Sequence, residues 1–215
     1  MKDDSYKSFM ERLLPTVDPH TILGLRMSEI QSMMKYYPDH QAFFQQVPHT
    51  YLEENHMHAL LIQKRLHGFD ETLQETNHFL PFIDNWAVCD SFRPTALRQD
   101  PNRLLACIHT WLESKHVYTV RLGLVLLINW FLEDDFTVEI LRWVQAIDSK
   151  EYYVRMACSW FWSMAFVKQY EKTLPFFTSY TLDEWVHNKA IQKACESHQL
   201  DEDKKLFLKS LKIKK

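Results

Sequence analysis

Apolar residues recur every three or four positions along most of the chain, which is the pattern of amphipathic helices. Leu104, Ile108, Trp111 and Leu112 are one example, and the scarcity of glycine argues against hairpin-rich β folds. We therefore predict an all-α fold. The expected helices lie near residues 5–14, 28–37, 40–46, 51–67, 71–83, 86–97, 101–114, 117–132, 135–148, 152–170, 173–185, 188–198 and 201–212.

Polar and proline-containing segments separate these helices. Asp100 and Pro101 form a typical helix start, with an N-cap side chain followed by proline at the first helical position. The connections are about two to six residues long, as adjacent antiparallel helices prefer. Since no low-complexity linker interrupts the sequence, we predict a single domain over residues 1–215.

A basic residue recurs with a helical-repeat period in the second half of the chain. Arg121, Arg155 and Lys189 are spaced 34 residues apart, and a small residue follows each of them within two positions. Such a period is typical of stacked helix pairs, each of which buries its face against its neighbours. The sequence thus predicts an α-solenoid of antiparallel helix pairs with a concave groove.

Composition narrows the possible functions. Only three glycines occur, and there is no GxGxxG, GxxxxGK[ST] or GxSxG motif, so Gly-rich phosphate cradles and nucleophile elbows are excluded. No apolar run has the roughly 18 to 20 residues of a membrane span. The first residues are charged rather than secretory, and the four cysteines are scattered singly. We expect a cytoplasmic monomer with reduced cysteines and no membrane contact.

The net charge of −3 and the pI of about 6.4 are unusual for a nucleic-acid-binding protein. Affinity for DNA comes largely from neutralised phosphates. Binding would therefore require the cations to gather on one face.

Four residues could carry chemistry in the predicted groove. Trp86 and Asp90 are four apart on a predicted helix and so share a face. Arg121 and Trp160 follow in later repeats. Because stacked repeats place corresponding faces side by side, we expect two indoles, a carboxylate and a guanidinium to converge.

This order of residues resembles the AlkD-type DNA alkylation repair proteins, which are HEAT-like repeat alkylpurine DNA glycosylases. The resemblance covers about residues 10–212. It includes Asn85 with the Trp86 and Asp90 pair, then Arg121, Trp160 and the segment that begins at Asn188; the string from Ile22 to Arg26 adds to it.

The resemblance implies a DNA glycosylase that acts on cationic N3- or N7-alkylated purines in duplex DNA, without a cofactor. Asp90 would stabilise the oxocarbenium-like sugar and position water. Trp86 and Trp160 would form aromatic walls that favour cations, and Arg121 would hold a phosphate. A metal site is not expected, because residues two apart, such as His56 and His58, diverge on a helix.

Structural alternatives remain for two of these residues. Trp160 lies in an aromatic-rich helix, where a core role is common, and one of Trp160 and Trp162 must face inward. Arg121 recurs as Arg155 and Lys189, so it is equally a candidate for a repeat-architecture residue that pairs with carboxylates.

The chain departs from the family pattern near its N-terminus. Active members carry an extra short helix that grips DNA, whereas residues 14–21 here contain Pro15 and Pro19 and no Lys or Arg. We predict a branch with a reduced DNA grip. Three hypotheses follow: an active glycosylase, a weak or selective DNA binder that does not cut, and a helical-repeat scaffold for a protein partner.

Overall fold

The computed structural model describes residues 3–214, and these residues contain helices and no β-strand. The all-α prediction is therefore confirmed. The chain divides into two compact units, one ending at Leu104 and the other beginning at Leu105. The prediction that they form one domain stays a prediction.

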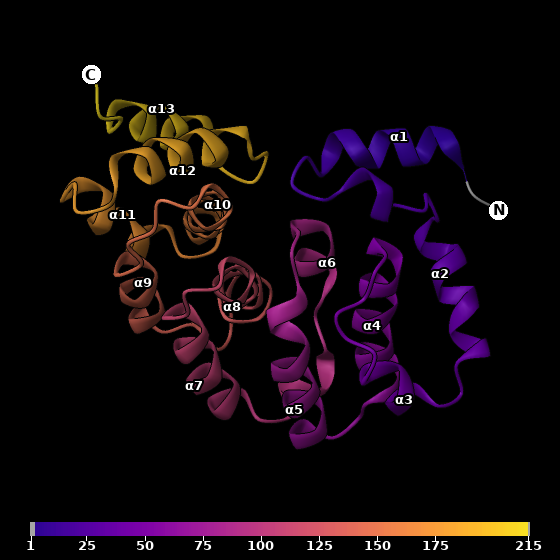
Figure 1. Cartoon of the computed structure of the whole chain (residues 1–215). Helices are drawn as coiled ribbons and strands as arrows, with labels where there is room; N and C mark the ends of the chain where they lie inside the picture. Colours follow the sequence, from indigo (N-terminus) through magenta and orange to yellow (C-terminus); the bar gives the residue numbers. More distant parts are fainter. Residues whose placement is uncertain (1–2, 215) are drawn as a thin grey trace. The chain divides into compact units, whose positions relative to one another are not determined.

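The first unit contains mostly short helices (Figure 1), and α2 and α5 each continue directly into a 3₁₀ helix. In chain order these are α1 (Asp4–Leu13), η1 (Pro19–Thr21), α2 (Met27–Met33), η2 (Met34–Tyr36), α3 (His40–Phe44), α4 (Leu52–Arg65), α5 (Phe69–Phe79), η3 (Leu80–Phe82), α6 (Trp86–Ser91) and η4 (Thr95–Gln99).

One predicted helix of this unit is wrong in length. Residues 86–97 form two elements, α6 and η4, rather than one helix. Helix α6 ends at Ser91, and Phe92 is already extended. Pro94 also disfavours helical backbone at Arg93, so the two elements do not join. The expected absence of an α-helix at residues 14–21 is confirmed, since only the turn η1 lies there.

A buried carboxylate fixes the segment between η1 and α2. Glu53 of α4 is 5% exposed and accepts hydrogen bonds from the backbone amides of Leu23, Gly24 and Leu25 at 2.8–3.2 Å. Gly24 has φ +81°, and a Cβ there would lie 2.8 Å from Cβ of Lys7. This tether fixes the start of α2, which packs against α4.

The second unit is more regular. Its helices are α7 (Pro101–Leu112), which begins at the end of the first unit, α8 (Val117–Trp130), α9 (Val138–Gln145), α10 (Tyr152–Lys168), α11 (Tyr170–Thr178), α12 (Glu184–Glu196) and α13 (Glu202–Ser210). Figure 1 shows α7, α9 and α11 in one layer and α8, α10 and α12 in the other.

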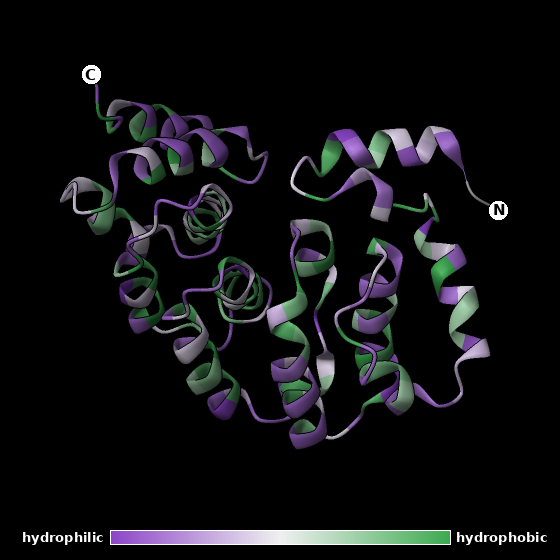
Figure 2. Ribbon diagram, in the orientation of Figure 1, coloured by the Kyte–Doolittle hydropathy of each residue, from purple (hydrophilic) through white to green (hydrophobic). Residues whose placement is uncertain are grey.

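Helix α10 is the centre of this unit, because it packs against both α8 and α12. Every residue of α8 from Tyr118 to Ile128 is buried, and the helix is hydrophobic along most of its length (Figure 2). A helix that is apolar all round requires neighbours on every side. The three helices that carry the 34-residue period are therefore consecutive packing partners.

Several boundaries in this unit differ from those predicted. The helix expected at 173–185 runs from Tyr170 to Thr178, and the next begins at Glu184. Asp183 caps α12 by accepting from the amide of Val186 at 3.0 Å. Among the described residues, no helix has both the length and the apolar character required to cross a membrane.

Candidate functional site

The candidate carboxylate lies on the short helix α6, whose start is locked by a buried cap. Asn85 is 0% exposed, and its Oδ1 accepts from the amide of Val88 at 3.0 Å. Its Nδ2 donates to Asp84 at 2.7 Å, so both ends of the amide are engaged. The cap fixes the direction in which the first turn of α6 points.

The side chains of α6 divide between core and surface. Val88 and Cys89 are 0% exposed, whereas Trp86 and Asp90 are both half-buried. Trp86 and Asp90 are one helical turn apart, so they share a face. The first unit thus presents an indole and a carboxylate together, on a helix that packs against α4.

A groove of about 310 Å³ adjoins the end of α6 in the same unit. Ser91, the residue after Asp90, is one of its lining residues. The others are Met27, Gln31, His56, Ala59, Leu60, Gln63, Lys64, Arg93 and Thr95. The lining contains two cations and no carboxylate.

In the second unit, Arg121 connects two repeat helices. It is 7% exposed, and its Nη1 donates to the backbone oxygen of Tyr153 in the first turn of α10 at 2.8 Å. The contact connects two repeat helices through a backbone oxygen, and the pairing of Arg121 with carboxylates stays a prediction. The phosphate contact predicted for it stays a prediction.

Arg155 repeats this arrangement one helix later. Its Nη2 pairs with Asp183, the N-cap of α12, at 2.7 Å, and its guanidinium lies 4.7 Å from the ring centre of Trp185. Lys189, the third member of the series, instead donates to Gln192 within α12 at 3.2 Å. The series therefore connects α8 to α10 and α10 to α12.

Trp160 and Trp162 lie on different faces of α10, as residues two apart on a helix must. Trp162 is 0% exposed and packs against Phe161 and Phe177. Trp160 is half-buried, so part of its indole is accessible. Trp86 and Asp90 belong to the first unit and Arg121 and Trp160 to the second, and their convergence stays a prediction.

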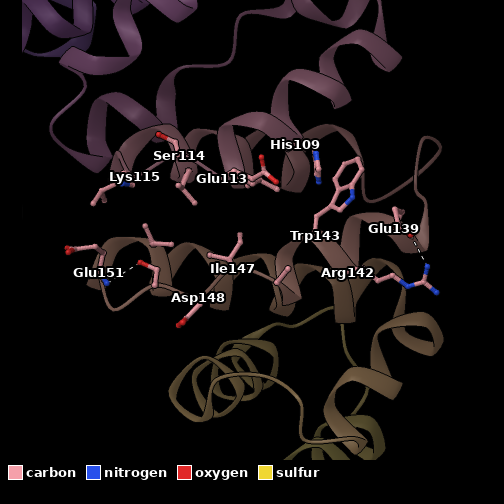
Figure 3. Close-up of a pocket in the computed structure, with 16 residues that line it drawn as sticks. His109, Glu113, Ser114, Lys115, Glu139, Arg142, Trp143, Ile147, Asp148 and Glu151 are labelled. Carbon is pink, nitrogen blue, oxygen red and sulfur yellow. Dashed lines mark hydrogen bonds and ion pairs between the residues drawn. The ribbon is translucent and has the colours of Figure 1, made fainter.

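A larger groove of about 750 Å³ lies in the second unit between α7 and α9, where α8 and α10 begin (Figure 3). The indole of Trp143 points toward His109, with ring centres 4.6 Å apart. Four carboxylates and two Lys or Arg side chains line this groove. The carboxylates are those of Glu113, Glu139, Asp148 and Glu151, and the basic residues are Lys115 and Arg142. Since Arg142 is paired with Glu139 at 2.8 Å, the local charge is acidic.

Sequence reasoning missed a buried histidine network in the first unit. His58 is 0% exposed, its Nδ1 lies 2.8 Å from Nε2 of His49, and its Nε2 lies 3.1 Å from Oε1 of Glu75. Nδ1 of His78 is 2.9 Å from the same oxygen. Only the abundance of histidine between residues 49 and 78 could have pointed to it.

Burial controls the protonation of these histidines. It lowers the pKa of His49 to about 4, assisted by the neighbouring His58, and also lowers the pKa of His58 despite the hydrogen bond to Glu75. Burial alone lowers the pKa of His56 to about 4. Within residues 3–214, no three His, Cys, Asp or Glu side chains are gathered as a metal site would require.

Comparison with known families gives one match. A family model described as "DNA alkylation repair enzyme" matches residues 1–194, which is most of the chain. Comparison with curated proteins and comparison with solved structures each found no match.

Proposed function

The chain belongs to the DNA alkylation repair enzyme family, and from this premise we propose that it hydrolyses the N-glycosidic bond of cationic N3- or N7-alkylated purines in duplex DNA. Family membership supports a general role in DNA alkylation repair with DNA as the partner. The glycosylase reaction and the roles of individual residues are the proposal.

Departure of the alkylated base requires little assistance from the protein. An N3- or N7-alkylated purine already carries a positive charge, so it departs as a neutral base with the electrons of the C1′–N bond. Positive charge then develops on the deoxyribose, and the oxygen of a water molecule bonds to C1′ while releasing a proton. One carboxylate can stabilise that charge and accept the proton.

Asp90 is the carboxylate that we assign to this role. The observation that carries the assignment is its position on α6, half-buried beside Trp86 on a helix fixed by the fully buried Asn85. Electrostatic stabilisation is effective when the charged group is held in place before the reaction begins. A locked first turn supplies that condition.

Trp86 and Trp160 are assigned as aromatic walls. Both are half-buried, and an indole face attracts a cationic base or an oxocarbenium-like sugar. Arg121 is assigned a phosphate contact that would have to coexist with its bond to Tyr153. We also propose that α7–α13 form HEAT-like repeats and that the fold is a solenoid with a concave groove, supported by the packing of the three period-bearing helices.

The burial and hydrogen bonding of Arg121 favour a second function. Because Arg121 is 7% exposed as a residue and its guanidinium is bonded to a backbone oxygen, a grip on DNA that depends on it would be weak. A family member that binds DNA weakly or selectively without cutting is therefore the alternative. The protein-scaffold alternative is supported by the acidic groove between α7 and α9.

Base release from methylated duplex DNA tests the proposal. DNA treated with N-methyl-N-nitrosourea is incubated with the protein, and released 7-methylguanine and 3-methyladenine are measured by mass spectrometry. We expect release above the spontaneous rate. Salt-sensitive DNA binding without release would select the non-cutting alternative, and no DNA binding at low salt would select the scaffold.

A further inference from the structure

The groove beside α6 has a lining suited to an anion. Its two charged lining residues are Lys64, in the last turn of α4, and Arg93, in the segment after α6. The remaining polar lining residues are amides, hydroxyls and one imidazole, with no carboxylate among them. A volume of about 310 Å³ is small, which suits a compact group rather than a macromolecular segment.

The backbone places Arg93 at this groove by a specific contact. The amide of Arg93 donates to Oε1 of Gln63 at 2.9 Å, and Nε2 of Gln63 donates to the oxygen of Ala59 at 3.2 Å. Pro94 then keeps the segment extended instead of continuing α6. Helix α4 thus carries Lys64 itself and also holds Arg93 in position.

His56 is another lining residue, and it carries a buried polar atom without a partner. It is 7% exposed, and its Nδ1 has no hydrogen-bond partner among the described residues. Because burial keeps its pKa near 4, the imidazole is neutral at pH 7 and can donate one hydrogen bond without bringing a charge. Buried polar atoms of this kind usually have a partner, and a bound ligand is one source.

We propose that this groove binds a phosphate group, with Lys64 and Arg93 supplying the charge and His56 a neutral hydrogen bond. Two sources offer that chemistry: a phosphodiester of a nucleic-acid strand and a free phosphate ester. The strand source rests on the proposed function, because Ser91 and Arg93 lie one and three residues after Asp90, and a phosphate held there would belong to the strand that Asp90 acts on. The free-ester source does not depend on it.

DNA binding tests the strand source. The affinity for a methylated duplex is measured between 50 and 300 mM salt for the wild type, Lys64→Gln, Arg93→Gln and the double variant. Each lost phosphate contact is expected to reduce the slope of log affinity against log salt by about 1. Arg65→Gln is the matched control, because Arg65 is the exposed neighbour of Lys64 on α4 and does not line the groove.

The free-ester source is tested by NMR of the His56 ring protons. Inorganic phosphate and 2′-deoxyguanosine 5′-monophosphate are titrated, with 2′-deoxyguanosine and acetate as controls. We expect a saturable shift with the two phosphates that the double variant loses and Arg65→Gln keeps. A shift in the His56 signals alone establishes the free ester, and a change in the salt slope alone establishes the strand.

Two results would overturn the phosphate site. One is an equal response of His56 to the neutral nucleoside or to acetate. The other is an unchanged salt slope together with no shift on phosphate addition. Base release by a protein that gives either result would leave the proposed function intact, whereas phosphate binding without base release would retain the site and reject the glycosylase.

Discussion

Each of the two units is stabilised internally by a different kind of contact. The first depends on buried polar groups, namely Glu53 against three backbone amides and His58 between His49 and Glu75. The second depends on long apolar helices, with Arg121 and Arg155 each connecting one repeat helix to the start of the next. A regular repeat can rely on one recurring contact, while an irregular set of short helices requires a separate contact at each junction.

The groove beside α6 and the groove between α7 and α9 differ in charge. The groove beside α6 is lined by two cations and no carboxylate, and the groove between α7 and α9 by four carboxylates and two cations. The phosphates of DNA are attracted by the first lining and repelled by the second. A choice by volume would favour the larger groove, whose lining is acidic. A choice by charge favours the groove beside α6 for the proposed DNA contact, because its lining is cationic.

The largest stability effect is expected at Glu53. Glu53→Ala leaves three amides of residues 23–25 without their acceptor, and bonds to a charged group are costly to lose, so we expect about 3 kcal/mol of destabilisation. Urea unfolding measures the loss. Hydrogen exchange followed by mass spectrometry should show faster exchange at residues 22–26.

Glu54→Ala is the control for this variant. Glu54 caps the amides of Thr50 and Tyr51, which are at the surface, so about 1 kcal/mol is expected. Equal losses for the two variants would contradict the importance that we give to the buried tether.

Arg121, Arg155 and Lys189 differ in how they connect the repeat helices, so their replacement should lower the stability of the second unit by different amounts. Arg121→Met should cost about 2 kcal/mol, because a part-buried backbone oxygen loses its charged donor and the buried arginine side chain loses its packing. Arg155→Met should cost about 1 kcal/mol, since that pair is partly exposed. Lys189→Met should have little effect, and thermal unfolding of the three variants measures the order.

The same variants separate the two interpretations of Arg121. If Arg121→Met left stability unchanged and reduced the salt slope of DNA binding by about 1, the phosphate role would be its main one. A stability loss with an unchanged slope would make it an architectural residue.

Acid should weaken the first unit through its histidines. The pKa values of His49 and His56 are lowered from 6.5 to about 4, so the folded protein binds fewer protons than the unfolded chain in that range. Stability is therefore complete above pH 6.5 and falls as the pH drops toward 4. His116 and His187, whose pKa values burial also lowers, add to this fall from the second unit.

Urea midpoints between pH 7 and pH 4.5 measure this dependence. His49→Asn should give a shallower fall than the wild type, while His20→Gln, at an exposed position, should match it. A fall that is as steep without His49 would remove this histidine from the explanation.

The smallest effect is expected at the acidic groove. Glu113→Gln and Trp143→Ala should change DNA affinity by less than about twofold, because an acidic lining does not hold phosphates. Fluorescence anisotropy with a labelled duplex measures this. A marked loss of DNA binding in Trp143→Ala would contradict the division of roles between the grooves.

Regular features of the fold could be predicted from the sequence. The helices with strong apolar periodicity, the start of α7 after Asp100 and the pairing of the period-bearing helices all follow from local patterns. The inward position of Trp162 follows from its spacing to Trp160. Each of these depends on residues that are close in sequence or repeat at a fixed interval.

The remaining features depend on contacts that no local pattern encodes. Glu53 meets an amide 29 residues away, and His58 meets Glu75 at a distance of 17 residues. The groove beside α6 combines residues from Met27 to Thr95, and its two cations are separated by 29 positions of ordinary polar sequence. Trp86 and Asp90 are half-buried one turn apart on α6, and their convergence with Arg121 and Trp160 stays a prediction.

Single-turnover base release from N-methyl-N-nitrosourea-treated duplex, compared between the wild type and Asp90→Asn, tests the central claim most directly. Asp134→Asn is the control, since it makes the same charge change at an exposed turn. We predict release by the wild type and by Asp134→Asn, and release about 100-fold slower by Asp90→Asn, with undiminished DNA affinity. Equal rates for Asp90→Asn and the wild type would contradict the assignment of Asp90 as the carboxylate that stabilises the sugar.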